Sequence, residues 1–239
     1  MHVYFVGDTA AGPRLFRELR PDLDADSGVV LGIDAALRGD ALDPDYRSPW
    51  PEGVVLRQWS DRPDGITVSL EGAPVERPAD MSEEEARLAL EQLVRTAQEV
   101  YGRGRVPVDV QIEQQVTDTV LGVPTTAPLT GSRDLDVLAP VSISGPAEGA
   151  VVDNDEMLRV HTRAASADGD LTVVVARRDG PGPVSRGRLI GTVPSDRFSA
   201  FDMSLDLSGG PPGDYVVTAT VENSDGTTDS DTRRITIVD

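Results

Sequence analysis

Three acidic residues at alternating positions, Asp22, Asp24 and Asp26, form the group in this 239-residue sequence that most resembles a metal site. Alternating carboxylates open the calcium loop of an EF-hand, and hard oxygen ligands suit Ca²⁺. The pattern then breaks, because Gly28 comes one place late and Ile33 stands at the twelfth position, where a bidentate Glu is needed. A solvated turn that caps a helix also explains the spacing, and the sequence favours this interpretation over calcium.

A second group of candidate residues lies in the segment 43–51 (DPDYRSPWP), where prolines surround Tyr46, Arg47 and Trp50. Tyr, Arg and Trp are enriched at interface hot spots, so the segment is a candidate contact surface for a protein partner. The alternative is that it folds back over its own core. Aromatic residues make up only 4% of the chain, and a core short of aromatics favours this alternative.

The groups that nucleophilic catalysis uses are scarce. The sequence has no Cys, and all 22 of its basic residues are Arg, which excludes thiolate nucleophiles, Schiff-base lysines and Walker-type phosphate loops. His161 alternates with Arg159 and Arg163 in an expected strand, which favours a solvent-facing side chain over a catalytic one. No pair of carboxylates stands out as a glycosidase site. We therefore predict that the chain is not an enzyme and uses no cofactor.

The charge of the chain limits its partners. It has 41 Asp and Glu against 22 Arg, which gives a formal net charge of −19. Phosphate backbones and anionic lipid would repel such a protein, so nucleic-acid binding is excluded. No apolar run approaches the ~18 residues of a transmembrane helix, so direct membrane insertion by the chain as written is not expected. A protein partner or self-association remains.

The first half of the chain mixes helix and strand patterns. Ser82 and Glu85 form a capping box that opens a helix over 83–101, which Gly102 ends. A second helix is expected over 28–38, and residues 15–20 fit either a strand or a helix. Both apolar helix stripes would lie on one sheet face, giving an α+β two-layer sandwich of two helices on a mixed sheet. Strands are expected at 2–6, 53–60, 65–70 and 106–113, with a tight turn at Asp64-Gly65 where glycine supplies a positive φ.

The second half carries strand and turn patterns only. The change from mixed helix and strand patterns to strand and turn patterns alone predicts two domains, 1–138 and 139–239. About seven short strands in roughly 100 residues are typical of an all-β immunoglobulin-like sandwich. Tyr215 follows Pro212-Gly213-Asp214 and is expected to fold back structurally on that corner, and the nearby Asp225, Asp229 and Asp231 are expected in solvated turns. The strands are expected at 141–144, 157–162, 171–177, 189–193, 198–207, 215–221 and 233–238.

Longer stretches of the sequence resemble a known family. VYFVGDTAAGPRLFRE, ALDPDYRSPWPEGV, MSEEEARLALEQLVRTAQEV and DTVLGVPTTAPLT together are similar to the GerMN-type sporulation and spore-germination domain in its actinobacterial form. This resemblance covers residues 2–135. The segment from PVSIS at 140–144 through PPGDYVVTATVENSDGT resembles the immunoglobulin-like domain of bacterial spore germination proteins, which commonly follows the GerMN domain.

The resemblance implies a location and a role. The family is extracytoplasmic, is often anchored as lipoproteins and has no assigned catalytic residues, and its founding members help to assemble or stabilise an envelope-spanning complex. It therefore implies a non-enzymatic scaffold or interaction protein of the cell envelope, whose partner is an envelope protein or a second copy. The sequence lacks a lipobox Cys, so any lipid anchor would belong to a segment absent here. The alternative is a ligand-binding module for cell-wall glycan or calcium.

Overall fold

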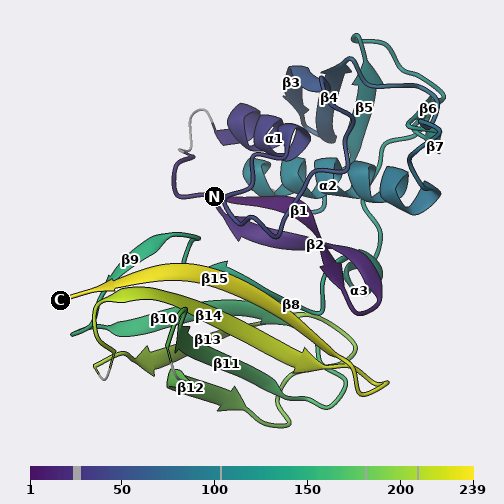
Figure 1. Ribbon diagram of the computed structural model, residues 1–239. Coiled ribbons are helices and arrows are strands. Elements are labelled where there is room, and N and C mark those ends of the chain that lie inside the picture. The colour runs from purple at the N-terminus through teal and green to yellow at the C-terminus, as the bar shows by residue number, and fades with distance from the viewer. Residues whose placement is uncertain (24–27, 103, 181, 209) are drawn as a thin grey trace. The chain divides into compact units, whose positions relative to one another are not determined.

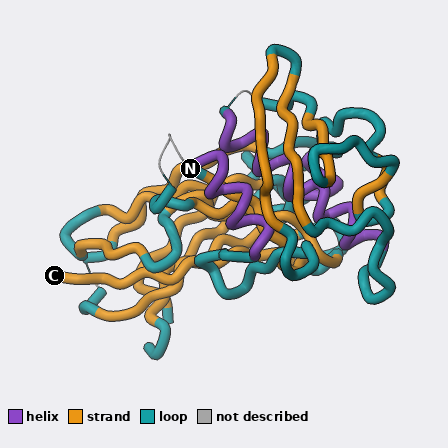
Figure 2. The backbone as a smooth tube through the Cα atoms, turned by 90° about the horizontal axis from the view of Figure 1, so that it is seen from above, coloured by secondary structure: helices purple, strands orange, loops and turns teal. Residues whose placement is uncertain are grey.

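The computed structural model describes residues 1–23, 28–102, 104–180, 182–208 and 210–239. The protein is mostly β with few helices, and strands (orange in Figure 2) form most of its regular structure. The chain divides into two units, and the main division falls between Arg133 and Asp134. The first unit comprises Met1–Gly7, Pro13–Phe16 and Arg20–Arg133; the second comprises Asp8–Gly12, Arg17–Leu19 and Asp134–Asp239.

The first unit is built on a three-stranded sheet that carries two helices on one face (Figure 1). Its elements are β1 (His2–Thr9), β2 (Gly12–Leu19), α1 (Gly28–Arg38), β3 (Val55–Arg62), β4 (Gly65–Glu71), α2 (Glu83–Tyr101), β5 (Val108–Ile112), β6 (Thr119–Val120) and β7 (Val123–Pro124), although the tip of the β1–β2 hairpin belongs to the second unit. β3 pairs antiparallel with β4, and β4 pairs parallel with β5, so the sheet is mixed as predicted. Apolar side chains of both helices and of β4 and β5 meet in one buried cluster.

The helices are also covered on the side away from this sheet, which differs from the two-layer expectation. β1 and β2 form a separate two-stranded sheet, so the ambiguous residues 15–20 lie mainly in a strand. Gln92 and Thr96 of α2 are fully buried and bond to the backbone of Tyr4 in β1. A buried helix face is recognised in a sequence by regularly spaced apolar residues. The second buried face of α2 is made of polar side chains that bond to a strand backbone, so the apolar spacing of α2 did not reveal it.

The hairpin at Asp64-Gly65 is confirmed, but the predicted reason for its glycine is wrong. Gly65 does not have a positive φ. Instead, a Cβ at this position would lie 2.5 Å from the carbonyl oxygen of Pro107, which accepts a hydrogen bond from Ile66 N at 2.9 Å. Glycine is required because the backbone leading into β5 approaches closely.

The capping box of α2 is present as predicted. Ser82 Oγ accepts from Glu85 N at 3.1 Å, and the Glu85 carboxylate accepts from Ser82 N at 2.9 Å. Gly102 ends the helix with φ 73°. The hydrogen bonds from the Ser82 backbone and then from its hydroxyl hold the pKa of Glu85 below its ordinary value of 4.5.

Replacing Ser82 by Ala is expected to destabilise the first unit by about 1 kcal/mol at neutral pH, because a backbone N–H at the helix start loses its acceptor. Since the folded pKa of Glu85 is depressed, the stabilisation from its carboxylate is complete above pH 4.5 and disappears as the pH falls through the lowered value. Urea unfolding of the wild type and of Ser82→Ala across this range measures the effect. A penalty that grows on acidification would contradict this assignment.

The second unit contains two sheets that share one apolar cluster. The sheet orders are β13-β10-β8 and β12-β11-β14-β15-β9. Buried residues of both sheets, such as Val160 and Val217, belong to the common cluster. The elements are α3 (Asp134–Val137), β8 (Val141–Gly145), β9 (Ala150–Asp153), β10 (Met157–Ala164), β11 (Leu171–Arg177), β12 (Pro183–Leu189), β13 (Ser199–Asp206), β14 (Gly213–Glu222) and β15 (Thr228–Val238).

Two details of the predicted strand pattern in this unit are wrong. A strand was expected at 189–193, but β12 runs earlier in the chain, from Pro183 to Leu189. Its polar sequence, with Arg186 and Arg188, lacks the apolar alternation that marks a strand. β9 was not predicted, since four residues are too few to establish a period.

Tyr215 occupies the structural role predicted for it. The residue is 1% exposed, and its hydroxyl donates to the carbonyl oxygen of Pro211 at 2.7 Å. Removing the hydroxyl by Tyr215→Phe is expected to cost about 1–2 kcal/mol, because this carbonyl loses its donor. Chemical denaturation of the full chain, followed by hydrogen exchange of β14, tests this. Unchanged stability would show that water replaces the bond.

Candidate functional site

A groove of about 390 Å³ runs along one side of α2 in the first unit. Apolar side chains and polar or charged groups both line it, so it could hold a mixed apolar and polar segment. Its lining residues are Arg87, Leu90, Glu91, Val94, Val123, Pro128, Leu129, Thr130, Gly131 and Ser132.

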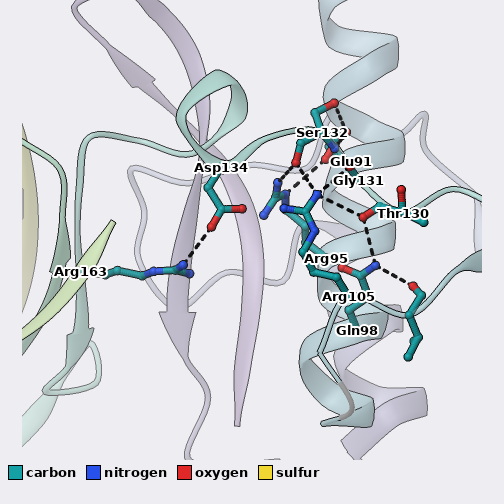
Figure 3. A network of polar contacts seen from close by, with 10 residues as sticks. Glu91, Arg95, Gln98, Arg105, Thr130, Gly131, Ser132, Asp134 and Arg163 are labelled. Carbon is teal, nitrogen blue, oxygen red and sulfur yellow. Dashed lines mark hydrogen bonds and ion pairs between the residues drawn. The ribbon is translucent and has the colours of Figure 1, made fainter. Parts of the chain in front are cut away.

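Two arginines fix the wall of the groove opposite α2 (Figure 3). Arg105 donates from Nη2 to the carbonyl oxygens of Gly131 at 2.7 Å and Ser132 at 2.6 Å, with a longer contact of 3.3 Å to Thr130. Arg95 of α2 donates to the Ser132 carbonyl at 2.7 Å. The guanidinium groups thus supply hydrogen-bond donors to the backbone carbonyl oxygens of a loop that has no strand partner at these residues.

Glu91 joins the same network from α2. Its carboxylate pairs with Arg95 Nε at 3.2 Å, in an ion pair whose side chains are 7% and 12% exposed, and it accepts from Ser132 N at 2.6 Å. Gly131 has φ 75°, and a Cβ there would lie 3.2 Å from Glu91. Gln98 closes the network through the carbonyl oxygen of Thr130, at 3.4 Å. The wall is therefore held in place before anything binds, which lowers the entropic cost of association.

Sequence reasoning did not find this groove. Glu91 and Arg95 are four residues apart on a helix, a spacing that ordinarily marks an exposed surface pair. Their burial depends on the loop at 128–132, whose residues are far from both in the sequence and show no helix or strand pattern. The one available signal was the position of Gln92 and Arg95, which are polar but directly flank the apolar residues of α2. This position could have indicated that a second face of the helix is buried.

The candidate contact residues Tyr46, Arg47 and Trp50 do not form a common surface. Tyr46 and Trp50 are 8% and 6% exposed, and the ring of Tyr46 packs on that of Phe16 with centroids 5.1 Å apart. Arg47 is exposed, and its backbone pairs with Val6 at 2.8 and 2.9 Å. As a correction to the interface interpretation, the segment folds back on its own core, and only Arg47 is accessible to a partner.

The candidate calcium residues are only partly described. Asp22 receives two hydrogen bonds from Arg20, at 3.0 and 2.8 Å, and this guanidinium lowers the pKa of Asp22. Asp24 and Asp26 lie outside the described residues. Within the described ranges, no group of three or more His, Asp or Glu residues is arranged to hold a metal ion.

The acidic group near the end of the chain differs from expectation, because two of its members are buried. Asp225 lies in an exposed turn, where hydrogen bonds from the Thr227 hydroxyl and backbone lower the pKa of Asp225. Asp229 and Asp231 are each 4% exposed. Asn223 donates to Asp229 at 2.8 Å. Both buried carboxylates therefore stabilise the fold and do not lie in solvated turns.

His161 lies on the surface, as predicted. Its Nδ1 lies 2.5 Å from a carboxylate oxygen of Asp202, and the two side chains are 51% and 77% exposed. They meet because β10 pairs with β13 in a register that sets His161 opposite Asp202. An exposed pair of this kind contributes little to stability.

Residues 2–118 match the family model Germane, described as sporulation and spore germination. This part of the chain is a GerMN-type domain.

Two further comparisons add little to this assignment. A solved structure described as tandem GerMN domains of the sporulation protein GerM from Bacillus subtilis is similar at 14% identity and a TM-score of 0.34, over 55% of this chain and 46% of that one. The present chain thus spans about half of that structure. No curated protein matches. Among the described helices, none has the length and apolar character needed to cross a membrane.

Proposed function

We propose that this chain is a non-enzymatic scaffold or interaction protein of the cell envelope, located outside the cytoplasm, and that its GerMN-type domain contacts a protein partner through the groove along α2. The family match of residues 2–118 supports a role in sporulation or spore germination. The observation that carries the proposal is the groove wall. The loop is held in one conformation by hydrogen bonds from Arg95 and Arg105 and to Glu91. Such a preformed surface loses less entropy when it binds a partner.

The second unit fits an immunoglobulin-like domain in this proposal, with domains at 1–138 and 139–239. β8 pairs with β10 in one sheet, and β9 then pairs parallel with β15 in the other. Two packed sheets and a corner tyrosine such as Tyr215 are features of immunoglobulin-like sandwiches. This domain would act as a spacer or as a second contact surface.

Filling the groove tests the proposal. Thr130 lines the groove, is exposed and contributes its carbonyl oxygen to the network, so Thr130→Trp adds bulk without removing that bond. Thr126→Trp is the matched control, because Thr126 is an exposed threonine of the same segment outside the groove. Each variant, displayed in the native envelope, is used to recover bound proteins.

The expected result is a protein recovered with the wild type and Thr126→Trp and lost with Thr130→Trp. If the protein associates with itself through this surface, Thr130→Trp alone will shift its sedimentation to the monomer. Identical partners and sedimentation for all three proteins would contradict the proposal.

A further inference from the structure

One strand of the second unit has an incomplete partner on one side. β10 pairs with β13 along Met157–Ala164, but with β8 only from His161 to Ala164. Among the residues that the structure describes, no strand pairs with Met157–Val160 on the side away from β13. Backbone groups on this side form an open strand edge, the kind of edge that templates pairing with another chain.

The edge is open because the chain leaves this sheet at Gly145. A Cβ on Gly145 would lie 2.9 Å from the His161 ring, and the register shifts beside His161. Pro146 follows and has no N–H with which to continue the ladder. Glu148 then accepts from Arg234 N at 2.8 Å, which holds the crossing segment against β15. β9 continues on the other sheet, and the edge of β10 stays uncovered.

A groove of about 610 Å³ lies between β9 and this edge. Val151 on its rim is 68% exposed and Met157 is 52% exposed, whereas Leu158 is buried. Two of the outer strands, β12 and β13, carry charges that discourage pairing, such as Arg186 in β12 and Asp202 in β13. The groove is lined by Val151, Val152, Asp153, Glu156, Met157, Leu158 and Arg159.

The acidic residues around the groove favour a basic occupant. Asp153, Asp155 and Glu156 are exposed at one end, and Arg159 is the one basic residue of the lining. Among the described residues, none of these three acids forms an ion pair with another side chain. A basic segment would complement them. A second copy of this chain would bring a net charge of −19 and is disfavoured.

We propose that the open edge of β10 at Met157–Val160 binds an extended, basic segment of a partner protein as an added strand, with apolar side chains of that segment between Val151 and Met157. Main-chain hydrogen bonds supply affinity in strand addition, and alternate side chains supply specificity. This site is separate from the groove along α2, so the two proposals can fail independently.

The test titrates the full chain with an acetylated peptide that alternates Lys and Val over the 8-residue length of β10. Backbone amide NMR should show shifts and slowed hydrogen exchange at 157–160. A Glu-Val peptide of equal length should bind about tenfold more weakly or not at all, because the acidic end of the groove repels it. A Lys-Val peptide with a central proline should also lose affinity, since proline interrupts the ladder.

Two matched variants distinguish binding at this site from nonspecific binding of the peptide. Val151→Lys places a cation on the rim and should weaken binding of the Lys-Val peptide about tenfold. Ile190→Lys is the control, because Ile190 is 67% exposed, like Val151, but lies outside the groove. Equal binding of the Lys-Val and Glu-Val peptides, equal loss in both variants, or protection away from 157–160 would overturn the proposal. Concentration-dependent self-association abolished by Val151→Lys would also overturn it, in favour of a second copy.

Discussion

Replacing Asp231 by Leu is expected to destabilise the second unit by about 3–5 kcal/mol, because it leaves the Arg233 guanidinium in the interior without this carboxylate. Arg233 is 0% exposed, and Asp231 lies 3.0 Å from it. The carboxylate also accepts from Ile143 N at 2.6 Å, and Arg233 donates to the Ile143 carbonyl at 2.8 Å. The pair therefore joins β15 to β8 across the two sheets. Hydrogen exchange of β8 and β15 with increasing urea measures the loss.

The double variant Asp231→Leu/Arg233→Met distinguishes a lost charge partner from general disruption. Apolar residues of similar volume often replace a buried ion pair with little loss, so the double variant should recover most of the stability that Asp231→Leu removes. The control is Asp196→Asn, because Asp196 and Arg197 are 76% and 69% exposed and should contribute at most about 1 kcal/mol. A double variant less stable than Asp231→Leu would contradict this account.

Replacing Gln92 by Leu is expected to destabilise the first unit by about 2–6 kcal/mol, since each of the two buried carbonyl oxygens that lose their donor costs about 1–3 kcal/mol. Gln92 is 0% exposed, and its Nε2 donates to the carbonyl oxygens of Tyr4 at 2.9 Å and Ala36 at 3.1 Å. One side chain thus holds β1 and α1 to α2. Because both tryptophans of the chain, Trp50 and Trp59, lie in the first unit, tryptophan fluorescence during urea unfolding reports this unit selectively.

Gln58→Leu is the matched control for this substitution, because Gln58 is an exposed residue of β3. Its effect should stay within about 0.5 kcal/mol. If Gln92→Leu were as mild as Gln58→Leu, water would have to satisfy both carbonyl oxygens, and Gln92 would not be the link between β1 and α1.

Elements with strong local patterns could be predicted from the sequence. The capping box at Ser82 and the stop at Gly102 gave the bounds of α2 correctly, because capping and helix periodicity are local properties. The strand of Tyr215 and its fold-back contact were likewise predictable from the preceding turn residues.

Features that depend on long-range contacts could not be predicted. The turn Ile112–Gln115 places Glu113 and Gln114 at φ 50° and 63°, a geometry that normally requires Asn or Gly. Arg95, Asp231 and Arg233 look like surface residues by type, and only the packing of distant strands and loops buries them. The groove along α2 also depends on such contacts, because Arg105 and Ser132 meet across 27 positions of the chain.

The central claim is that the groove along α2 is a contact surface, and site-specific cross-linking in the native envelope tests it most directly. The chain has no Cys, so Arg87→Cys places a unique thiol at the groove, where Arg87 is 68% exposed. Arg197→Cys supplies a control thiol at a residue that is 69% exposed and outside the groove. With a short thiol-reactive photo-cross-linker, we expect a discrete adduct from Arg87→Cys that Arg197→Cys does not give. Indistinguishable products from the two positions would contradict the claim.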